Sequence, residues 1–318
     1  MSSGSLPGSD NAALIGLDLG GTKIAAALIG ADGTVLARHT RPTPAGSGAA
    51  AVLDALATAA AEVDPGRGAS ALGIAAAGVI DPRTGRVTSA TDSISGWAGT
   101  VLGAGLADRT GLPVACDNDV RATAGPELAA LDTEHGSLLF AAIGTGVGGA
   151  VAVDGRMLHG AAGIAGHLGH VPSPQAAGLP CTCGATGHLE VIASGPAITA
   201  HYQRLTGTTV DRLETVAARA AQGDADAVQA ITTGAAAAGQ ALGGLANALG
   251  PDRIVVGGGV PRIGALYGDA LATALAAELM PPLRGLVPRA PLFGADAAVL
   301  GAAALTASLP LHHPGALR

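Results

Sequence analysis

Aromatic residues and charged residues are both scarce in this sequence of 318 residues. Phe, Trp and Tyr together make up 2% of the chain, and Asp, Glu, Lys and Arg together make up 13%. Hydrophobic residues nevertheless reach 48%, and there are 50 glycines. The cores must therefore be layers of small side chains, chiefly Ala, Val and Leu, with backbones that approach one another closely.

These shortages exclude several classes of protein. A net charge of −7 and only 17 Lys and Arg residues argue against a nucleic-acid surface, because such surfaces neutralise phosphates with basic side chains. No uninterrupted apolar run reaches the roughly 20 residues that cross a bilayer, so we expect no membrane segment. The start of the chain lacks the charged and apolar regions of a signal peptide, and three cysteines suit a reducing compartment, so we expect a cytoplasmic protein.

One pattern occurs twice along the chain. From Leu14 an apolar strand, a Gly-rich turn, a second strand, an Asp-Gly turn and a third strand follow one another, and the same order returns from Leu138. We interpret this as a diverged internal duplication, which predicts two α/β domains with a cleft between them. The turn-rich segment 79–97 is predicted to be a loop that faces this cleft. Helices are predicted at 49–63, 98–110, 120–131, 215–222, 226–249, 267–278 and 296–309.

The same patterns predict where the domains begin and end. We expect a flexible N-terminus over 1–12, an N-terminal α/β domain over 13–119 and a larger C-terminal α/β domain over 120–295. A C-terminal helix over 296–310 is expected to pack back on the N-terminal domain, and a tail follows over 311–318.

Each copy of the repeat carries a Gly-rich turn after its first strand. Such turns present backbone N–H groups that can bind a polyphosphate, and the hydroxyls of Thr22 and Thr145 can add to this. The carboxylate of Asp18 could hold Mg²⁺ or its waters. A tight hairpin explains either turn alone equally well, but the pair favours nucleotide binding.

A dinucleotide-binding fold is the alternative for the second turn, which matches G-x-G-x-x-G from Gly144 to Gly149. That fingerprint should open a helix, whereas the residues that follow are β-compatible and end in an Asp-Gly turn. The chain also contains no G-x-x-x-x-G-K-[ST] motif, so a P-loop is excluded.

The triplet Asp117-Asn118-Asp119 ends a predicted strand, where ligand sites of α/β folds gather. A carboxylate there could accept a proton from an attacking hydroxyl. An Asx-rich turn is the alternative.

Two histidines and two cysteines have the spacing of metal ligands. Ten residues separate His170 from Cys181, one separates Cys181 from Cys183, and four separate Cys183 from His188. Such a set can bind Zn²⁺ tetrahedrally, and four protein ligands make a structural site rather than a catalytic one. A Gly-rich loop with incidental thiols is the alternative, and a Cys181 to Cys183 disulfide would be strained. Cys116 is expected to be a buried small hydrophobe.

With these motifs the chain resembles the ROK family of bacterial sugar kinases and related repressors, from about Leu14 to Leu309. The motifs are Leu17-Asp-Leu-Gly-Gly-Thr-Lys23, Asp117-Asn-Asp119, Ile143-Gly-Thr-Gly-Val-Gly-Gly149, the zinc stretch, and Val255-Val-Gly-Gly-Gly259. The resemblance implies the actin-like, hexokinase-like ATPase fold, ATP with Mg²⁺, and transfer of the γ-phosphoryl group to a sugar hydroxyl, usually the 6-OH. It also implies a homodimer.

The resemblance assigns roles to individual residues. Asp119 is the expected general base, Asn118 and Glu190 the expected sugar ligands, and Ser93 stands where many members carry an asparagine near the sugar. His170 is expected both to bind zinc and to contact the sugar. The expected ATP and phosphate ligands are Asp18, Gly20, Gly21, Thr22, Lys23, Gly144, Thr145, Gly146, Gly257, Gly258 and Gly259.

Two residues depart from the usual pattern of the family. His167 replaces the glutamate of Glu-[Ile/Leu]-Gly-His, and this histidine is typical of the bacterial N-acetylmannosamine kinases of the family. An imidazole can donate a hydrogen bond where an ionised carboxylate cannot, so it makes other demands on the C2 substituent. His188 stands in place of the third zinc cysteine, and a His₂Cys₂ set remains a stable combination.

The sequence therefore favours an ATP-dependent kinase of a hexose or N-acetylhexosamine, with N-acetyl-D-mannosamine as the favoured sugar and glucokinase as the alternative. A non-catalytic sugar-sensing regulator is the rival from another class, but the residues before the first strand are too few for a helix-turn-helix domain. A zinc hydrolase is a further rival, and it would need an open coordination position.

Overall fold

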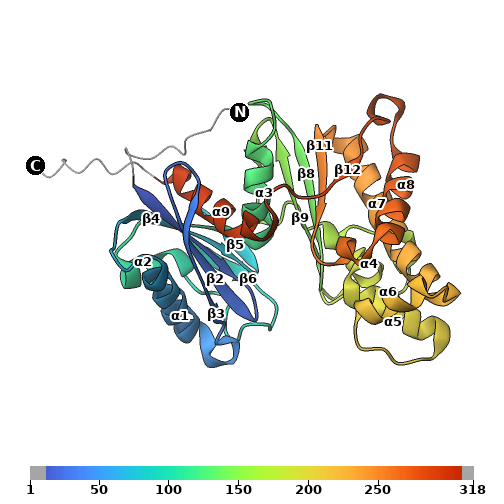
Figure 1. The fold of residues 1–318 in the computed structure, drawn as a ribbon, viewed down its shortest axis with the longest axis horizontal. Coiled ribbons are helices and arrows are strands. Elements are labelled where there is room, and N and C mark those ends of the chain that lie inside the picture. Colours follow the sequence, from blue (N-terminus) through green and yellow to red (C-terminus); the bar gives the residue numbers. More distant parts are fainter. Residues whose placement is uncertain (1–11, 310–318) are drawn as a thin grey trace, which may run out of the picture. The chain divides into compact units, whose positions relative to one another are not determined.

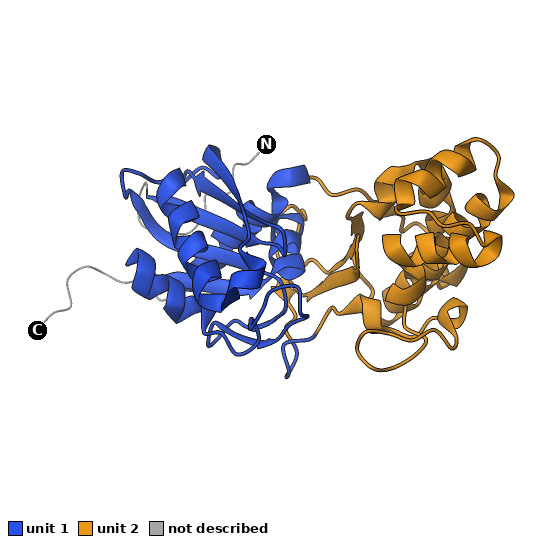
Figure 2. Cartoon of the chain, turned by 90° about the horizontal axis from the view of Figure 1, so that it is seen from below, with its two compact units in different colours: residues 1–129, 160–164, 293–318 blue, residues 130–159, 165–292 orange. Residues whose placement is uncertain are grey.

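The computed structural model describes residues 12–309, so the expected N-terminal and C-terminal tails lie almost entirely outside the described residues. The chain forms two compact units, shown in Figure 2. Unit 1 comprises 1–129, 160–164 and 293–318, and unit 2 comprises 130–159 and 165–292. Short segments thus return to unit 1 after the chain has entered unit 2.

Unit 1 is built on a mixed five-stranded sheet of order β3-β2-β1-β4-β7. The strands are β1 (Ala13–Leu19), β2 (Lys23–Ile29), β3 (Val35–Pro42), β4 (Ala69–Ala76) and β7 (Val114–Asn118). β1 pairs antiparallel with β2 and parallel with β4, and β4 pairs parallel with β7. The carboxyl ends of β1, β4 and β7 therefore meet at one edge of the sheet, where Asp18 and the Asp117-Asn118-Asp119 triplet lie.

Helices cover both faces of this sheet. α1 (Gly48–Val63) and α2 (Leu102–Thr110) share one core with β1, β2 and β4. α3 (Asp119–Ala129) and α9 (Ala297–Ala304) pack on the other face. A Cβ at Gly73 of β4 would lie 1.7 Å from the carbonyl oxygen of Ala302, so glycine is required for α9 to pack this closely.

Unit 2 repeats the topology of unit 1 with the order β10-β9-β8-β11-β12. The strands are β8 (Leu138–Ile143), β9 (Val147–Val153), β10 (Arg156–Met157), β11 (Arg253–Gly257) and β12 (Pro288–Arg289). β8 pairs antiparallel with β9 and parallel with β11, as β1 does with β2 and β4. The shared strand order and directions agree with the internal duplication, and the mixed α/β class predicted from the sequence is confirmed.

The helices of unit 2 are α4 (Glu190–Ala193), α5 (Gly195–Thr206), α6 (Leu213–Ala221), α7 (Ala225–Leu249) and α8 (Ala265–Glu278). α7 and α8 lie side by side (Figure 1), and a Cβ at Gly239 of α7 would lie 2.3 Å from the carbonyl oxygen of Leu271 in α8. Among residues 12–309, no helix has the length and apolar character that a membrane crossing requires.

Some local predictions were incomplete. The segment predicted as a loop over 79–97 contains a hairpin of β5 (Val79–Asp81) and β6 (Arg86–Ser89). The predicted C-terminal helix ends at Ala304 and continues as a 3₁₀ turn over Leu305–Ser308. Helix α5 had no counterpart in the sequence prediction, although its Ser194 cap and the proline at position 196 are signals of a helix start.

Candidate functional site

The first Gly-rich turn joins β1 to β2 and is fixed by backbone hydrogen bonds. The N–H of Gly20 donates to the carbonyl of Lys23 at 3.0 Å, and Thr43 donates to the carbonyls of Gly20 and Thr22 at 2.8 and 3.0 Å. Thr22 and Lys23 are exposed, so their polar groups are available to a ligand.

Ser93 lies beside this turn. A Cβ at Gly21 would lie 3.5 Å from the Cβ of Ser93, whose hydroxyl is 3.0 Å from that of Thr91. The structure therefore brings a predicted sugar residue and a predicted phosphate residue of unit 1 together.

Asp18 and Asp119 are close enough to influence each other. Burial raises the pKa of Asp18 from 3.8 to about 6, the negative charge of Asp119 adds to this, and Lys23 opposes it. Burial also raises the pKa of Asp119, and hydrogen bonds from the Val120 N–H and the Asn118 side chain oppose the effect. A carboxylate with a raised pKa is a better proton acceptor, as a general base requires.

Asp119 is the first residue of α3, and among residues 12–309 only one of its two carboxylate oxygens accepts hydrogen bonds from the protein. Its Oδ1 accepts hydrogen bonds from Asn118 Nδ2 at 2.7 Å and from the Val120 N–H at 2.9 Å. Asn118 Nδ2 also donates to the Gly78 carbonyl at 3.0 Å, which holds the amide in place. Within the part of the chain that the structure describes, Asp119 Oδ2 has no hydrogen-bond partner, so it can accept a proton from a substrate.

Arg121 belongs to none of the sequence motifs, yet it lies beside the Asp117-Asn118-Asp119 triplet. Its guanidinium is buried against Asp117, with 2.8 Å between Nε and Oδ1. The signal that could have indicated it is the spacing of an acidic and a basic residue four positions apart, across the junction of a strand and a helix.

The second Gly-rich turn joins β8 to β9 in unit 2. The N–H of Gly144 donates to the carbonyl of Gly146 at 2.9 Å, and the N–H of Gly195 donates to the carbonyl of Gly144 at 2.8 Å. The turn is therefore attached to the first residue of α5. Glu190 Oε2 accepts the N–H of Val147 at 2.9 Å, so this predicted sugar ligand also contacts the turn.

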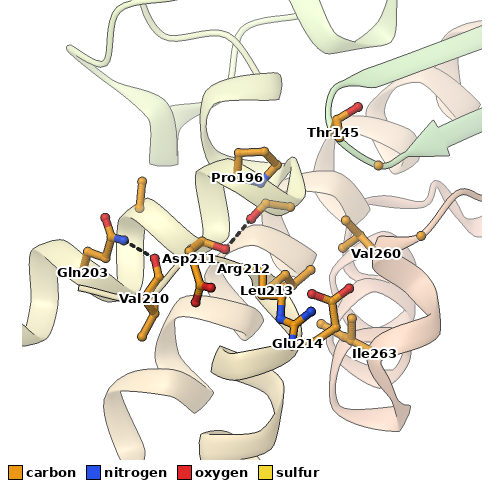
Figure 3. Close-up of a pocket in the computed structure, with 15 residues that line it drawn as sticks. Thr145, Pro196, Gln203, Val210, Asp211, Arg212, Leu213, Glu214, Val260 and Ile263 are labelled. Carbon is orange, nitrogen blue, oxygen red and sulfur yellow. Dashed lines mark hydrogen bonds between the residues drawn. The ribbon is translucent and has the colours of Figure 1, made fainter. Parts of the chain in front are cut away.

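A cavity of about 490 Å³ opens beside this turn (Figure 3). The predicted phosphate and adenosine residues that line it are Gly144, Thr145 and Gly259. The other lining residues had no sequence motif and come from α5, the segment that joins it to α6, the start of α6, and the segment after β11. They are Gly195, Pro196, Thr199, Ala200, Gln203, Val210, Asp211, Arg212, Leu213, Glu214, Val260 and Ile263. The volume suits a drug-sized ligand.

Gly257 and Gly258 contribute to packing rather than to the cavity wall. Gly258 has φ +99, and a Cβ there would lie 2.2 Å from the carbonyl oxygen of Ile143. A Cβ at Gly257 would lie 2.8 Å from Pro291. These two glycines allow the end of β11 to approach its neighbours, which places Gly259 at the cavity.

The four predicted metal ligands lie together in unit 2. Their ligand atoms, from His170, Cys181, Cys183 and His188, all lie within 4.8 Å of one another. His170 Nδ1 is 3.7 Å from Cys181 Sγ, and His188 Nδ1 is 3.3 Å from Cys183 Sγ. A tetrahedral zinc ion with ordinary bond lengths separates nitrogen from sulfur by about 3.5 Å, so the residues fit Zn²⁺.

The backbone around the cysteines forms a tight turn. The N–H of Gly184 donates to the carbonyl of Cys181 at 3.0 Å, and Gly184 has φ +92, which favours glycine. All three cysteines are unbridged, and Cys116 is buried as expected. Burial and the nearby Asp117 raise the pKa of the Cys116 thiol to about 12, so it is unreactive.

The predicted specificity residue lies next to the metal ligands. The rings of His167 and His170 are stacked at 6.4 Å between centroids, and the rings of His170 and His188 meet edge to face at 5.3 Å. The 3₁₀ turn over Leu168–His170 places His167 and His170 on the same segment.

A family model described as the ROK family matches residues 14–308. The chain belongs to the ROK family. It is 38% identical over 251 residues to an N-acetylmannosamine kinase of Shigella flexneri, covering 78% of this chain and 83% of the relative.

Two solved structures share the fold. A ROK hexokinase from Thermus thermophilus is 32% identical with a TM-score of 0.80, covering 92% of this chain and 97% of that one. A ROK family glucokinase from Streptomyces griseus, in complex with glucose and AMPPNP, is 31% identical with a TM-score of 0.75, covering 92% of this chain and 98% of that one. The resemblance that the motifs indicated is thus confirmed.

Proposed function

We propose that this chain is an ATP-dependent sugar kinase that transfers the γ-phosphoryl group to the 6-hydroxyl of a hexose or N-acetylhexosamine, with N-acetyl-D-mannosamine as the preferred substrate. The observation that carries the proposal is Asp119, a half-buried carboxylate whose Oδ1 accepts two hydrogen bonds while its Oδ2 is available to a substrate. Family membership and the Gly-rich turns support the same reaction class.

Asp119 acts as the general base. Its Oδ2 takes the proton of the 6-hydroxyl while that oxygen forms a bond to the γ-phosphorus, and the bond from the γ-phosphorus to the bridging oxygen of ADP breaks. Asn118 orients Asp119 through the 2.7 Å hydrogen bond to Oδ1. The raised pKa of Asp119 increases its affinity for the proton.

The nucleotide binds in the cavity of unit 2, with the adenosine against Gly259 and the phosphates toward Gly144 and Thr145. The carboxylates of Asp211 and Glu214 line this cavity and can accept hydrogen bonds from ribose hydroxyls. The carboxylate of Asp18 is a hard oxygen ligand that fits Mg²⁺ or its waters. When bound, Mg²⁺ would neutralise phosphate charge.

The two histidines and two cysteines of the cluster would hold a structural zinc ion. Four protein ligands leave no open position for a reacting water, so their role would be to hold the segments of His170 and His188 together around the ion. In this proposal His170 also contacts the sugar.

His167 selects the sugar. It takes the place of a carboxylate, so it can donate a hydrogen bond to an acceptor such as the carbonyl oxygen of an N-acetyl group. The relative from Shigella flexneri, named an N-acetylmannosamine kinase, supports this choice. The glucose complex of the Streptomyces griseus enzyme supports glucokinase as the second candidate.

A panel of hexoses and N-acetylhexosamines, assayed for ADP release and for the sugar phosphate, tests the proposal. We expect N-acetyl-D-mannosamine to give the highest kcat/KM, and Asp119→Asn to lower kcat by at least about 10²-fold. Full activity in Asp119→Asn would exclude this base, and absence of activity on every sugar would favour a sugar-sensing regulator. Light scattering in solution tests the expected homodimer.

A further inference from the structure

Arg121 is a buried cation next to the candidate base. It is 1% exposed and pairs with Asp117, which is 3% exposed. A buried ion pair adds little net stability, because the desolvation free energy of the two charges cancels much of the free energy of their attraction. Its position on the first turn of α3 therefore points to another role.

A continuous series of hydrogen bonds joins Arg121 to the base. Arg121 Nε donates to Asp117 Oδ1 at 2.8 Å, and the same oxygen accepts the N–H of Asn118 at 2.7 Å. The Asn118 side chain then donates to Asp119 Oδ1 at 2.7 Å. The orientation of Asp119 thus depends on residues that the guanidinium holds.

The other nitrogens of Arg121 bind carbonyl groups of two further segments. Nη1 donates to the Gly163 carbonyl at 3.0 Å, and Nη2 donates to the Ile80 carbonyl of β5 at 3.4 Å. Gly163 lies in the segment 160–164, which belongs to unit 1 and leads along the chain toward His167. Only the planar, five-donor guanidinium can satisfy these partners together, and a lysine ammonium cannot.

We propose that Arg121 is a positioning residue of the phosphoryl transfer, which fixes the direction of Asp119 Oδ2 through Asp117 and Asn118. This inference rests on the proposed function of Asp119 as the base. The rate of an enzymatic reaction can fall about 10²-fold when a reacting group is misplaced by about 1 Å. Losing the hydrogen bonds that hold Asp119 in place should therefore lower kcat.

The ion pair also distinguishes the two carboxylates of the triplet. Asp117 Oδ1 is occupied by the Arg121 guanidinium and by the Asn118 N–H, whereas Asp119 has an oxygen available to a substrate. The charge of Arg121 additionally opposes the effect of burial on the pKa of Asp119.

A charge-neutral double variant, Asp117→Asn with Arg121→Gln, tests the proposal without leaving an unpaired buried charge. We expect kcat to fall by about 10- to 100-fold, while the KM for ATP, whose cavity contains none of these residues, changes less than about twofold. Arg121→Lys should lie between the parent and the double variant. The matched control is Arg38→Gln with Asp296→Asn, an exposed pair of unit 1 at 2.7 Å, which should retain the parental kcat.

Crystal structures of the parent and the double variant, superposed on unit 1, provide a measurement that does not depend on activity. We expect the Asp119 carboxylate to be displaced or to occupy more than one rotamer. An unchanged kcat in folded protein, or an Asp119 in its parental position, overturns the proposal. If the parent phosphorylates no sugar, the proposed function fails, and the position of Asp119 in the two structures still decides whether Arg121 positions it.

Discussion

Glu190 occupies the space that a side chain at residue 146 would need. A Cβ added to Gly146 would lie 2.6 Å from Glu190 Oε2, the oxygen that accepts the Val147 N–H at 2.9 Å. A predicted sugar ligand is therefore in direct contact with the turn that the proposal assigns to the phosphates. The glycine at this position is required by the carboxylate as well as by the turn.

We predict that Gly146→Ala raises the KM for the sugar by about tenfold, because Glu190 must rotate away and lose its hydrogen bond to Val147. Glu190 is a flexible side chain, so the variant should fold with a melting temperature close to that of the parent. Steady-state kinetics with varied sugar measures the effect. Gly244→Ala on α7, where a Cβ meets nothing within 4 Å, is the matched control. If Gly146→Ala leaves the KM for the sugar unchanged, Glu190 is not a sugar ligand.

The ionised carboxyl of Asp18 should lower the free energy of unfolding at neutral pH. Its pKa is raised from 3.8 to about 6, so the unfolded chain loses the proton first and the stability falls as the pH rises between these values. The shift corresponds to at most roughly 3 kcal/mol above pH 6. Asp18→Asn should therefore be more stable than the parent at pH 7.5, by about 1–2 kcal/mol, and lose this advantage near pH 3.5.

Urea denaturation at the two pH values measures this difference. The exposed Asp132→Asn serves as the control and should show no gain at either pH. If Asp18→Asn is no more stable than the parent at pH 7.5, the carboxyl of Asp18 is not destabilised by burial and by Asp119.

Much of the fold could be predicted because the duplicated strands have strong local signals. The turn at Gly20 and Gly21 and the Asp-Gly turns follow apolar runs of strand length, so the succession of strands along the chain could be predicted from the repeat. The hairpin of β5 and β6 was missed because its short strands are rich in polar and turn residues. Their stability comes from contacts such as the buried side chains of Ile80 and Val87, which only tertiary packing provides.

Those residues of the candidate site that lie close together in the sequence could be predicted from their motifs. The metal ligands follow one another within 19 positions of sequence, from His170 to His188, and they meet in the structure. The cavity residues Asp211 and Glu214 could not be predicted, because no motif marks the segment before α6 or the first turn of α6, and both residues reach the cavity only through the packing of α5 and α6. Arg121 was missed because its role depends on the burial of its guanidinium.

The metal cluster yields a prediction that does not depend on activity. Purified protein should contain about one zinc ion per chain, and Cys183→Ala should lose most of it, because three remaining ligands bind the ion more weakly. Metal analysis by mass spectrometry measures the content, and a lower melting temperature should accompany the loss. Cys116→Ala removes a thiol outside the cluster and should retain the zinc. Full zinc content in Cys183→Ala would remove this residue from the ligand set.

The substrate assignment depends on His167, and the reverse substitution tests it. In His167→Glu an ionised carboxylate replaces an imidazole that can donate a hydrogen bond, so the variant should lose affinity for an N-acetyl carbonyl and gain affinity for a hydroxyl at C2. We expect the ratio of kcat/KM for N-acetyl-D-mannosamine to that for glucose to fall by at least about tenfold, a change typical of one altered polar contact. His167→Gln keeps a donor without the charge and should preserve most of the ratio. If the ratio is the same in the parent and in His167→Glu, residue 167 does not discriminate between substituents at C2 of the sugar. In that case the choice between the two sugars must come from other residues, such as Ser93 or Glu190.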